Sequence, residues 1–188
     1  FLLNNTIDEN NVVHLALGTS MAIIIVTSIS SIKAQQKKKA IVWDVVKMMV
    51  PGIFIGTFLA TFIASKLDSF YLSIIFSLFM FYSAVIMFVG KKPKPENKIF
   101  TSKTHVLSGG AIGALSSLVS IGGGIMSVPY LLHQNIDIKK AIATSSAIGL
   151  PIAISGTLGY IINGWSHTSI ETLTLGFVSI PALICVAF

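Results

Sequence analysis

The chain has 188 residues, of which 53% are apolar and only 11% charged, and its mean hydropathy is +0.83. Soluble domains carry about 25% charged residues, so this composition excludes an ordinary water-soluble domain and indicates an all-α polytopic membrane protein. The net charge of +6 does not point to nucleic acid, because all thirteen basic residues are lysines and nine of them lie in two short clusters between apolar stretches. Basic loops of this kind mark the cytoplasmic side of a membrane. The expected partners are therefore the lipid bilayer and a small molecule, with no nucleic acid.

Six apolar stretches follow one another and predict the membrane spans. They cover residues 12–32, 45–65, 70–89, 104–133, 141–162 and a sixth from about residue 170. A helix needs about 20 residues to cross the hydrocarbon layer. With both lysine clusters in the cytoplasm, the first span runs inward, the second outward, the third inward and the fourth outward. This topology leaves Lys139 and Lys140 outside as an exception.

The ends of the chain indicate a fragment of about six spans. The first residue is Phe1 rather than an initiator methionine, and the chain stops at Phe188 within an apolar run. The single cysteine, Cys185, excludes an internal disulfide and a Cys-rich metal site, and we interpret it as a small apolar residue. No metal or cofactor is expected.

The fourth apolar stretch contains three consecutive glycines, Gly122, Gly123 and Gly124, followed by Pro129. Irregular backbone inside a membrane survives only where it is wrapped in protein or lines a wet cavity. The run therefore predicts a break in a helix, with the restarting helix aiming free N–H groups and its positive dipole end into a cavity. The alternative is close helix packing by small residues without any ligand. We assign that packing role to Gly52-x-x-x-Gly56 and Gly109-x-x-x-Gly113.

Internal similarity predicts two repeats of about four membrane helices each. Residues 1–8 resemble residues 130–137, residues 16–22 align with residues 141–147, and residues 50–52 correspond to residues 180–182. An even number of crossings per repeat would give both repeats the same orientation, with the symmetry axis along the membrane normal. The predicted parts are residues 1–90 as the remainder of the first repeat, 91–103 as a basic cytoplasmic linker and 104–188 as a truncated second repeat.

The residues at 121–124, 128–129, 143–146 and 180–182, in this order, resemble the second half of the TauE/SafE family, bacterial membrane proteins associated with the export of sulfite and organosulfonates. The resemblance implies roughly eight spans in two repeats. It also implies a transporter in the bacterial cytoplasmic membrane that exports a small anion such as sulfite or an organosulfonate. The family does not fix the substrate. The alternatives are an anion channel and a membrane subunit that anchors a partner without transport.

The candidate substrate-binding residues combine the glycine run with nearby hydroxyls. They are Ser120, Gly122, Gly123, Gly124, Thr144, Ser145 and Ser146, with Thr19 and Ser20 as repeat mates of the second hydroxyl group. Hydroxyls and free N–H groups together could coordinate a small oxyanion. The alternative for the hydroxyls is a hydrogen bond to a carbonyl one turn back in their own helix. Ser116 and Ser117 are weaker candidates.

The charged residues bear on mechanism. The chain contains no arginine to clamp an oxyanion. Four of its seven carboxylates, Asp44, Asp68, Asp137 and Glu171, sit at span ends, and none lies within a span. A negative cell interior favours anion exit by about 2.3 kcal/mol per charge per 100 mV. We therefore expect a uniporter-like exporter without a buried proton relay. The four histidines also lie at span ends, and no enzyme motif is present, so we do not expect an enzyme.

Overall fold

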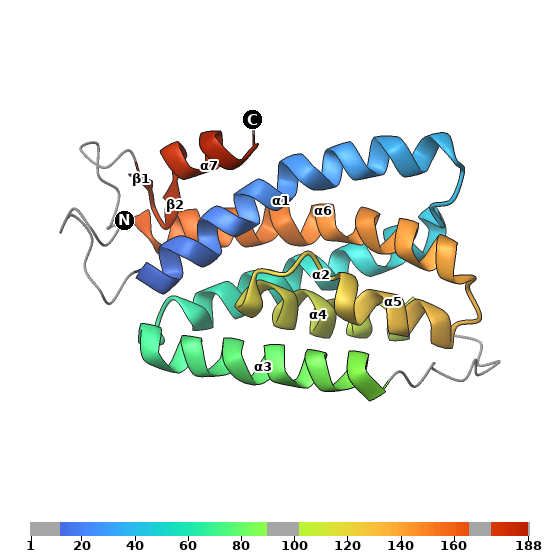
Figure 1. Ribbon diagram of the computed structural model, residues 1–188, viewed down its shortest axis with the longest axis horizontal. Helices are drawn as coiled ribbons and strands as arrows, with labels where there is room; N and C mark the ends of the chain where they lie inside the picture. The colour runs from blue at the N-terminus through green and yellow to red at the C-terminus, as the bar shows by residue number, and fades with distance from the viewer. Residues whose placement is uncertain (1–11, 90–101, 166–173, 188) are drawn as a thin grey trace.

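The computed structural model describes residues 12–89, 102–165 and 174–187 and shows a slab of packed helices (Figure 1). Its elements are α1 (Val12–Lys37), α2 (Trp43–Ala64), α3 (Ser69–Val89), α4 (Ser102–Val119), α5 (Gly124–His133), α6 (Ile138–Asn163), β1 (Thr174–Leu175), β2 (Val178–Ser179) and α7 (Ile180–Ala187). Three of the described helices, α1, α2 and α6, are long and apolar enough to cross a membrane. This arrangement agrees with the predicted all-α membrane fold. Residues 1–8, most of the 91–103 linker, His167 and Glu171 lie outside the described residues.

Sequence chemistry explains where several helices begin and how they pack. Asp137 precedes α6, and its carboxylate accepts a hydrogen bond from the Lys139 amide at 3.2 Å, which is a standard N-cap. The glycine motifs of α2 and α4 pack face to face, because a methyl group on Gly52 would collide with the Val106 carbonyl and one on Gly56 with the Gly110 carbonyl. The prediction that these motifs are packing faces is confirmed. Apolar side chains such as Phe58 and Phe81 cover the outer surface, as lipid contact requires.

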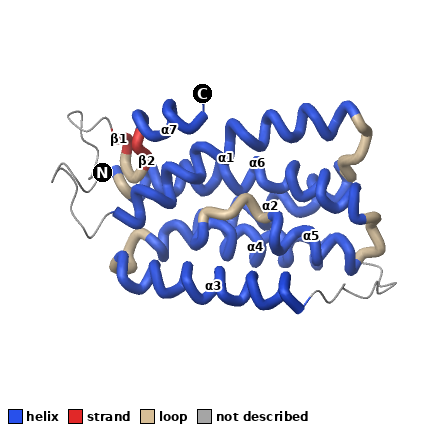
Figure 2. Tube along the Cα trace, viewed as in Figure 1, coloured by secondary structure: helices blue, strands red, loops and turns tan. Residues whose placement is uncertain are grey.

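Helices α4 and α5 form a hairpin rather than one crossing, as the tan loop between them shows (Figure 2). Near the start of α5, a Cβ built on Gly123 lies 3.6 Å from Ser116 Oγ, close to the end of α4. Near the end of α5, Tyr130 Oη lies 3.2 Å from His105 Nδ1, close to the start of α4. The chain therefore enters and leaves at the same end. The predicted outward crossing of residues 104–133 is wrong, because the break reverses the chain instead of interrupting a continuous helix.

This reversal moves Lys139 and Lys140 to the same end as the first lysine cluster. The Val42 amide, just before α2, donates to Thr144 Oγ1 in the second turn of α6 at 3.0 Å, so the starts of these helices lie together. We call this end the lysine end, and it includes Lys37, Lys38, Lys39, Lys47, Lys103, Lys139 and Lys140. Lys66, which follows α2, lies at the opposite end. The exception in the predicted topology disappears, and by the positive-inside rule we expect the lysine end to lie in the cytoplasm.

Helices α1 and α6 pack tightly and run in opposite directions. A Cβ on Gly18 would lie 3.2 Å from Tyr160 Cβ, one on Gly156 would lie 3.1 Å from Met21 Sδ, and one on Gly149 would lie 3.4 Å from Ser28 Oγ. Residue numbers increase along α1 as the numbers of their contact partners decrease along α6, so the two helices are antiparallel. The repeat alignment matched these two helices, so the predicted same orientation is wrong for this pair.

The end of the described chain also differs from the prediction. Residues 174–179 form a short antiparallel hairpin in which Thr174 pairs with Ser179 and Leu175 with Val178. Gly176 makes the tight turn possible because its φ of 58° suits a glycine. A helix starting near residue 170 is therefore wrong over these residues, and α7 begins only at Ile180. The hairpin is anchored by Phe177, which is 3% exposed and lies 5.1 Å from the His14 ring.

Candidate functional site

The helix break begins with a well-formed end to α4. Ser120 adopts a left-handed conformation with φ of 51°, and the Ile121 amide donates to the Ser116 carbonyl at 3.1 Å. A left-handed residue followed by this bond is the Schellman termination of a helix. Ser120 Oγ also donates to the Leu17 carbonyl of α1 at 2.8 Å. The break at the glycine run is confirmed, and it is fixed in place by α1.

The start of α5 exposes backbone donors. Gly123 precedes the helix with φ of 74°, and no side chain caps it. The amides of Met126 and Ser127 turn back to the Gly123 carbonyl at 3.2 and 2.8 Å. The amides of Gly124 and Ile125 come before the first intrahelical bond, so the helix itself gives them no acceptor. The positive end of the helix dipole adds to their attraction for an anion.

Helices α1 and α6 hold the glycine loop between them. A Cβ on Gly122 would lie 3.3 Å from Ile24 Cγ2 of α1. On the other side, a Cβ on Gly149 of α6 would lie 2.8 Å from the Gly122 carbonyl oxygen, closer than side chains normally come. The loop can therefore pass α6 at this distance only because position 149 is glycine, and it packs closely against α1 at Gly122. This contact sets the place where α5 starts.

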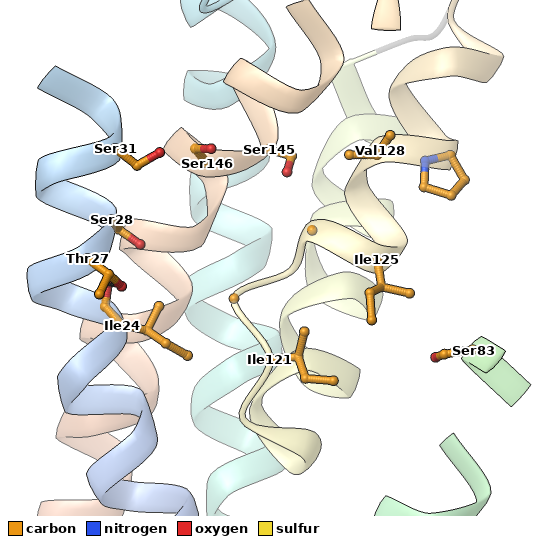
Figure 3. Close-up of a pocket in the computed structure, with 13 residues that line it drawn as sticks. Ile24, Thr27, Ser28, Ser31, Ser83, Ile121, Ile125, Val128, Ser145 and Ser146 are labelled. Atoms are coloured by element: carbon orange, nitrogen blue, oxygen red, sulfur yellow. Dashed lines mark hydrogen bonds between the residues drawn. The ribbon is translucent and has the colours of Figure 1, made fainter. Parts of the chain in front are cut away.

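A cavity of about 690 Å³ lies at this junction (Figure 3). Its volume falls within the range of small-molecule sites, about 300–1,000 Å³. Four elements contribute to it: α1, α3, α6 and the break with the first turns of α5. The lining residues are Ile24, Thr27, Ser28, Ser31, Ser83, Ile121, Gly122, Gly124, Ile125, Val128, Pro129, Ser145 and Ser146.

The cavity has a hydroxyl-rich wall and an apolar wall. Figure 3 shows the hydroxyls of α1 and α6 on one side and the side chains of Ile121 and Ile125 across from them. A Cβ on Gly124 would lie 3.6 Å from Ser145 Oγ, so the start of α5 lies next to the hydroxyl wall. Ser83 of α3 closes the far side; it is 4% exposed, and its Oγ has no hydrogen-bond partner among the described residues. An unpaired buried hydroxyl is costly, and a ligand oxygen would satisfy it.

Four of the nine sequence-predicted site residues line this cavity: Gly122, Gly124, Ser145 and Ser146. Gly123 lies in the same loop but does not line the cavity, and a Cβ on it would be 2.7 Å from Ile152 Cδ1. Ser120 is bonded to α1, as described above. Ser146 Oγ also donates to the Ile142 carbonyl at 3.1 Å, the intrahelical alternative that the sequence left open.

The threonines Thr19 and Thr144 serve as acceptors for backbone amides elsewhere. Thr144 accepts from the Val42 amide at 3.0 Å, and Thr19 accepts from the Ser179 amide at 2.9 Å. Neither threonine lines the cavity, and Ser20 does not line it either. Among the described histidines, His14, His105 and His133, none lines it.

Among the lining residues, sequence reasoning missed four that carry hydroxyls: Thr27, Ser28, Ser31 and Ser83. A signal for the first three exists, because residues 27–31 carry four hydroxyls within an otherwise apolar span. Ser83 has no such signal. It is one of four serines in an apolar helix, and only its place at the cavity in the folded chain distinguishes it.

Comparison with known proteins identifies the family of the chain. The family description "Sulfite exporter TauE/SafE" matches residues 2–188. The chain belongs to the TauE/SafE family. A probable membrane transporter protein of Haemophilus influenzae is 34% identical over 179 residues, which cover 95% of this chain and 68% of the relative. A probable membrane transporter protein of Methanocaldococcus jannaschii is 28% identical over 180 residues, covering 93% and 65%.

A third relative, the probable membrane transporter protein YdhB of Bacillus subtilis, is 28% identical over 160 residues, covering 81% of this chain and 65% of the relative. The chain thus spans about two thirds of the length of these curated relatives. No solved structure matches the chain. Together with its apolar helices, these relationships make this TauE/SafE chain part of a multi-pass membrane transporter.

Proposed function

We propose that this TauE/SafE protein exports a small anion, such as sulfite or an organosulfonate, across the cytoplasmic membrane through the cavity at the helix break. The observation that carries the proposal is the start of α5, where two amides without intrahelical acceptors lie beside a cavity lined by six serine and threonine hydroxyls. In this proposal Gly122, Gly124, Ser145 and Ser146 contact the anion. Ser120 and Gly123 fix the backbone around it.

The site suits weak binding and rapid release. Its attraction comes from backbone dipoles and hydroxyls, which lack the strength of bidentate arginine contacts. The cavity lies in the half of the bundle toward the lysine end, since it is lined by the last turns of α1 and the first turns of α6. Lysines at that end attract anions from the cytoplasm without entering the cavity. The membrane potential then favours exit.

We also propose that the two repeats are inverted rather than parallel. Thr19 of α1 and Thr144 of α6 occupy matching places in the repeat alignment, and each accepts the amide of the residue just before another helix, Ser179 before α7 and Val42 before α2. Antiparallel α1 and α6 with exchanged contacts fit a two-fold axis in the membrane plane. On this basis residues 1–90 and 104–188 belong to different repeats joined by residues 91–103. Thr19 and Ser20 would then serve the corresponding half of the site in the first repeat.

The test is uptake of labelled sulfite into proteoliposomes that hold the full-length protein under an imposed potential. Ser145→Ala and Ser28→Ala remove hydroxyls from the cavity, and Ser30→Ala is the matched control, because Ser30 is exposed on α1 and does not line the cavity. Saturable flux that falls in the two cavity variants and persists in the control supports an anion carrier. A channel would conduct without saturation or counter-exchange. A folded wild type that moves neither sulfite nor a sulfonate would contradict the proposal.

A further inference from the structure

The lining of the cavity at the break bears on the charge of its ligand. Its thirteen described lining residues include six hydroxyls, two glycines and five apolar side chains, and none of these side chains is ionisable. The nearest basic residue along α1 is Lys33, two positions after Ser31, and it is exposed. The attraction available inside the cavity therefore comes from dipoles rather than from formal charges.

A second feature shows that the cavity is built for a polar ligand. Ser83 reaches it from α3, a helix otherwise rich in exposed apolar side chains, and is almost fully buried, with an Oγ that has no hydrogen-bond partner in the described part of the chain. Figure 3 shows this oxygen directed toward the break. A donor placed across from the start of α5 allows an anion to be held from two sides.

Dipoles favour single charges over double charges. The cost of removing an ion from water grows with the square of its charge, whereas its attraction to fixed dipoles grows only in proportion to the charge. A monoanion can therefore be held by amides and hydroxyls alone. A compact dianion loses about four times as much hydration free energy in this Born picture, and it gains only about twice the dipolar attraction.

The apolar side chains of the lining, on both sides of the cavity, add a second requirement for the ligand. Ile24, Ile121, Ile125, Val128 and Pro129 face the same space as the hydroxyls. They offer favourable contact to an uncharged organic group and none to a second charged head.

We infer that the cavity selects anions with a single charged head, and that it discriminates against dianions of the same size. This inference rests on the proposed anion-transport function. Sulfite would then be carried as bisulfite, its singly protonated form. Organosulfonates with an apolar tail would be carried in preference to disulfonates.

The experiment compares ethanesulfonate with ethane-1,2-disulfonate, which share a carbon skeleton and differ by one charged head. Initial uptake of each is measured in proteoliposomes holding the full-length protein, at matched driving force. We expect disulfonate uptake to be slower by about tenfold or more. Equal rates would overturn the inference and leave the proposed function standing. Failure of the folded protein to carry ethanesulfonate, sulfite or any related anion would overturn both.

A charge-addition variant tests the cause. Ser31→Lys places an ammonium at the cavity wall, close to the lysine end where its charge can reach water. Ser30→Lys is the matched control, because it adds the same charge at the neighbouring exposed position outside the lining. We expect the disulfonate-to-ethanesulfonate ratio to rise in Ser31→Lys and to stay unchanged in Ser30→Lys. A rise of equal size in both variants would show that surface charge, rather than the cavity, sets the preference.

Discussion

Gly149 shows how a single hydrogen atom in place of a side chain positions the site. A methyl group there would lie 2.8 Å from the Gly122 carbonyl, so Gly149→Ala must push the glycine loop away from α6. We expect a loss of stability of about 1–3 kcal/mol and a loss of transport. Gly124→Ala is the control for stability alone, since its methyl group would make only an ordinary 3.6 Å contact and Gly124 itself lines the cavity. Thermal unfolding in detergent measures the difference, and similar melting temperatures for both variants would contradict the packing argument.

Thr144 has a role that its neighbours lack, because its hydroxyl oxygen accepts the Val42 amide across 102 residues of sequence. Thr144→Val keeps the shape of the side chain but leaves this amide without its acceptor. We expect a loss of about 1–3 kcal/mol in the free energy of unfolding, and near wild-type stability for Thr144→Ser, which restores the oxygen. If the serine variant is as unstable as the valine variant, the methyl group rather than the hydrogen bond is responsible.

These two residues also show what the sequence could and could not reveal. Three glycines within an apolar stretch predict a break, because hydrocarbon tolerates irregular backbone only in special places. The same glycines do not show which one faces the ligand, since that depends on how α6 packs against the loop. Gly123, at the centre of the run, proves to be turned away toward Ile152. The glycine run in the sequence therefore locates the site. Only tertiary packing decides which of its residues line the cavity and which hold the loop in place.

For helices α4 and α5, the sequence did not reveal the direction of the chain. Hydropathy records how much of a segment is apolar, but a broken segment of 30 residues can either cross the membrane or turn back within it. The only sequence clue was electrostatic: Lys139 and Lys140 contradicted the crossing topology. The hairpin of β1 and β2 was missed for a related reason, since Thr174, Val178 and their neighbours are as apolar as a short helix would be.

The hairpin of α4 and α5 predicts the side of the membrane from which a cysteine at position 140 can be labelled. In a background with Cys185→Ala and with any cysteine outside these 188 residues also replaced, we expect both Lys140→Cys and Lys38→Cys to react with an impermeant thiol reagent only from the cytoplasmic side. Lys66→Cys, at the opposite end, is expected to react only from outside. Labelling in intact cells and in inverted vesicles separates these outcomes. Reaction of Lys140→Cys from outside would restore the crossing topology and refute the hairpin.

The charged residues of the bundle lie at its ends rather than in its interior. The described acids Asp44, Asp68 and Asp137 lie at or beside helix ends, so no described carboxylate stands within the bundle to carry a proton with the anion. The cavity opens in the half nearest the lysine end, where cytoplasmic anions are concentrated by positive charge. On the proposed function, we expect transport to move net charge and to respond directly to the membrane potential.

The steepness of that response measures the charge that crosses. A potential of 100 mV is worth about 2.3 kcal/mol per charge, and a tenfold concentration ratio is worth about 1.4 kcal/mol. For a singly charged anion moving without a coupled ion, the equilibrium accumulation ratio of ethanesulfonate in proteoliposomes should therefore change about tenfold for every 60 mV. Potentials set by potassium gradients with valinomycin supply the series, with external and internal pH held equal. A slope of about tenfold per 30 mV would mean that two charges move in each cycle. A ratio that ignores the potential and follows an imposed pH difference would mean proton coupling, and the source of that proton would then have to be sought outside the carboxylates named above.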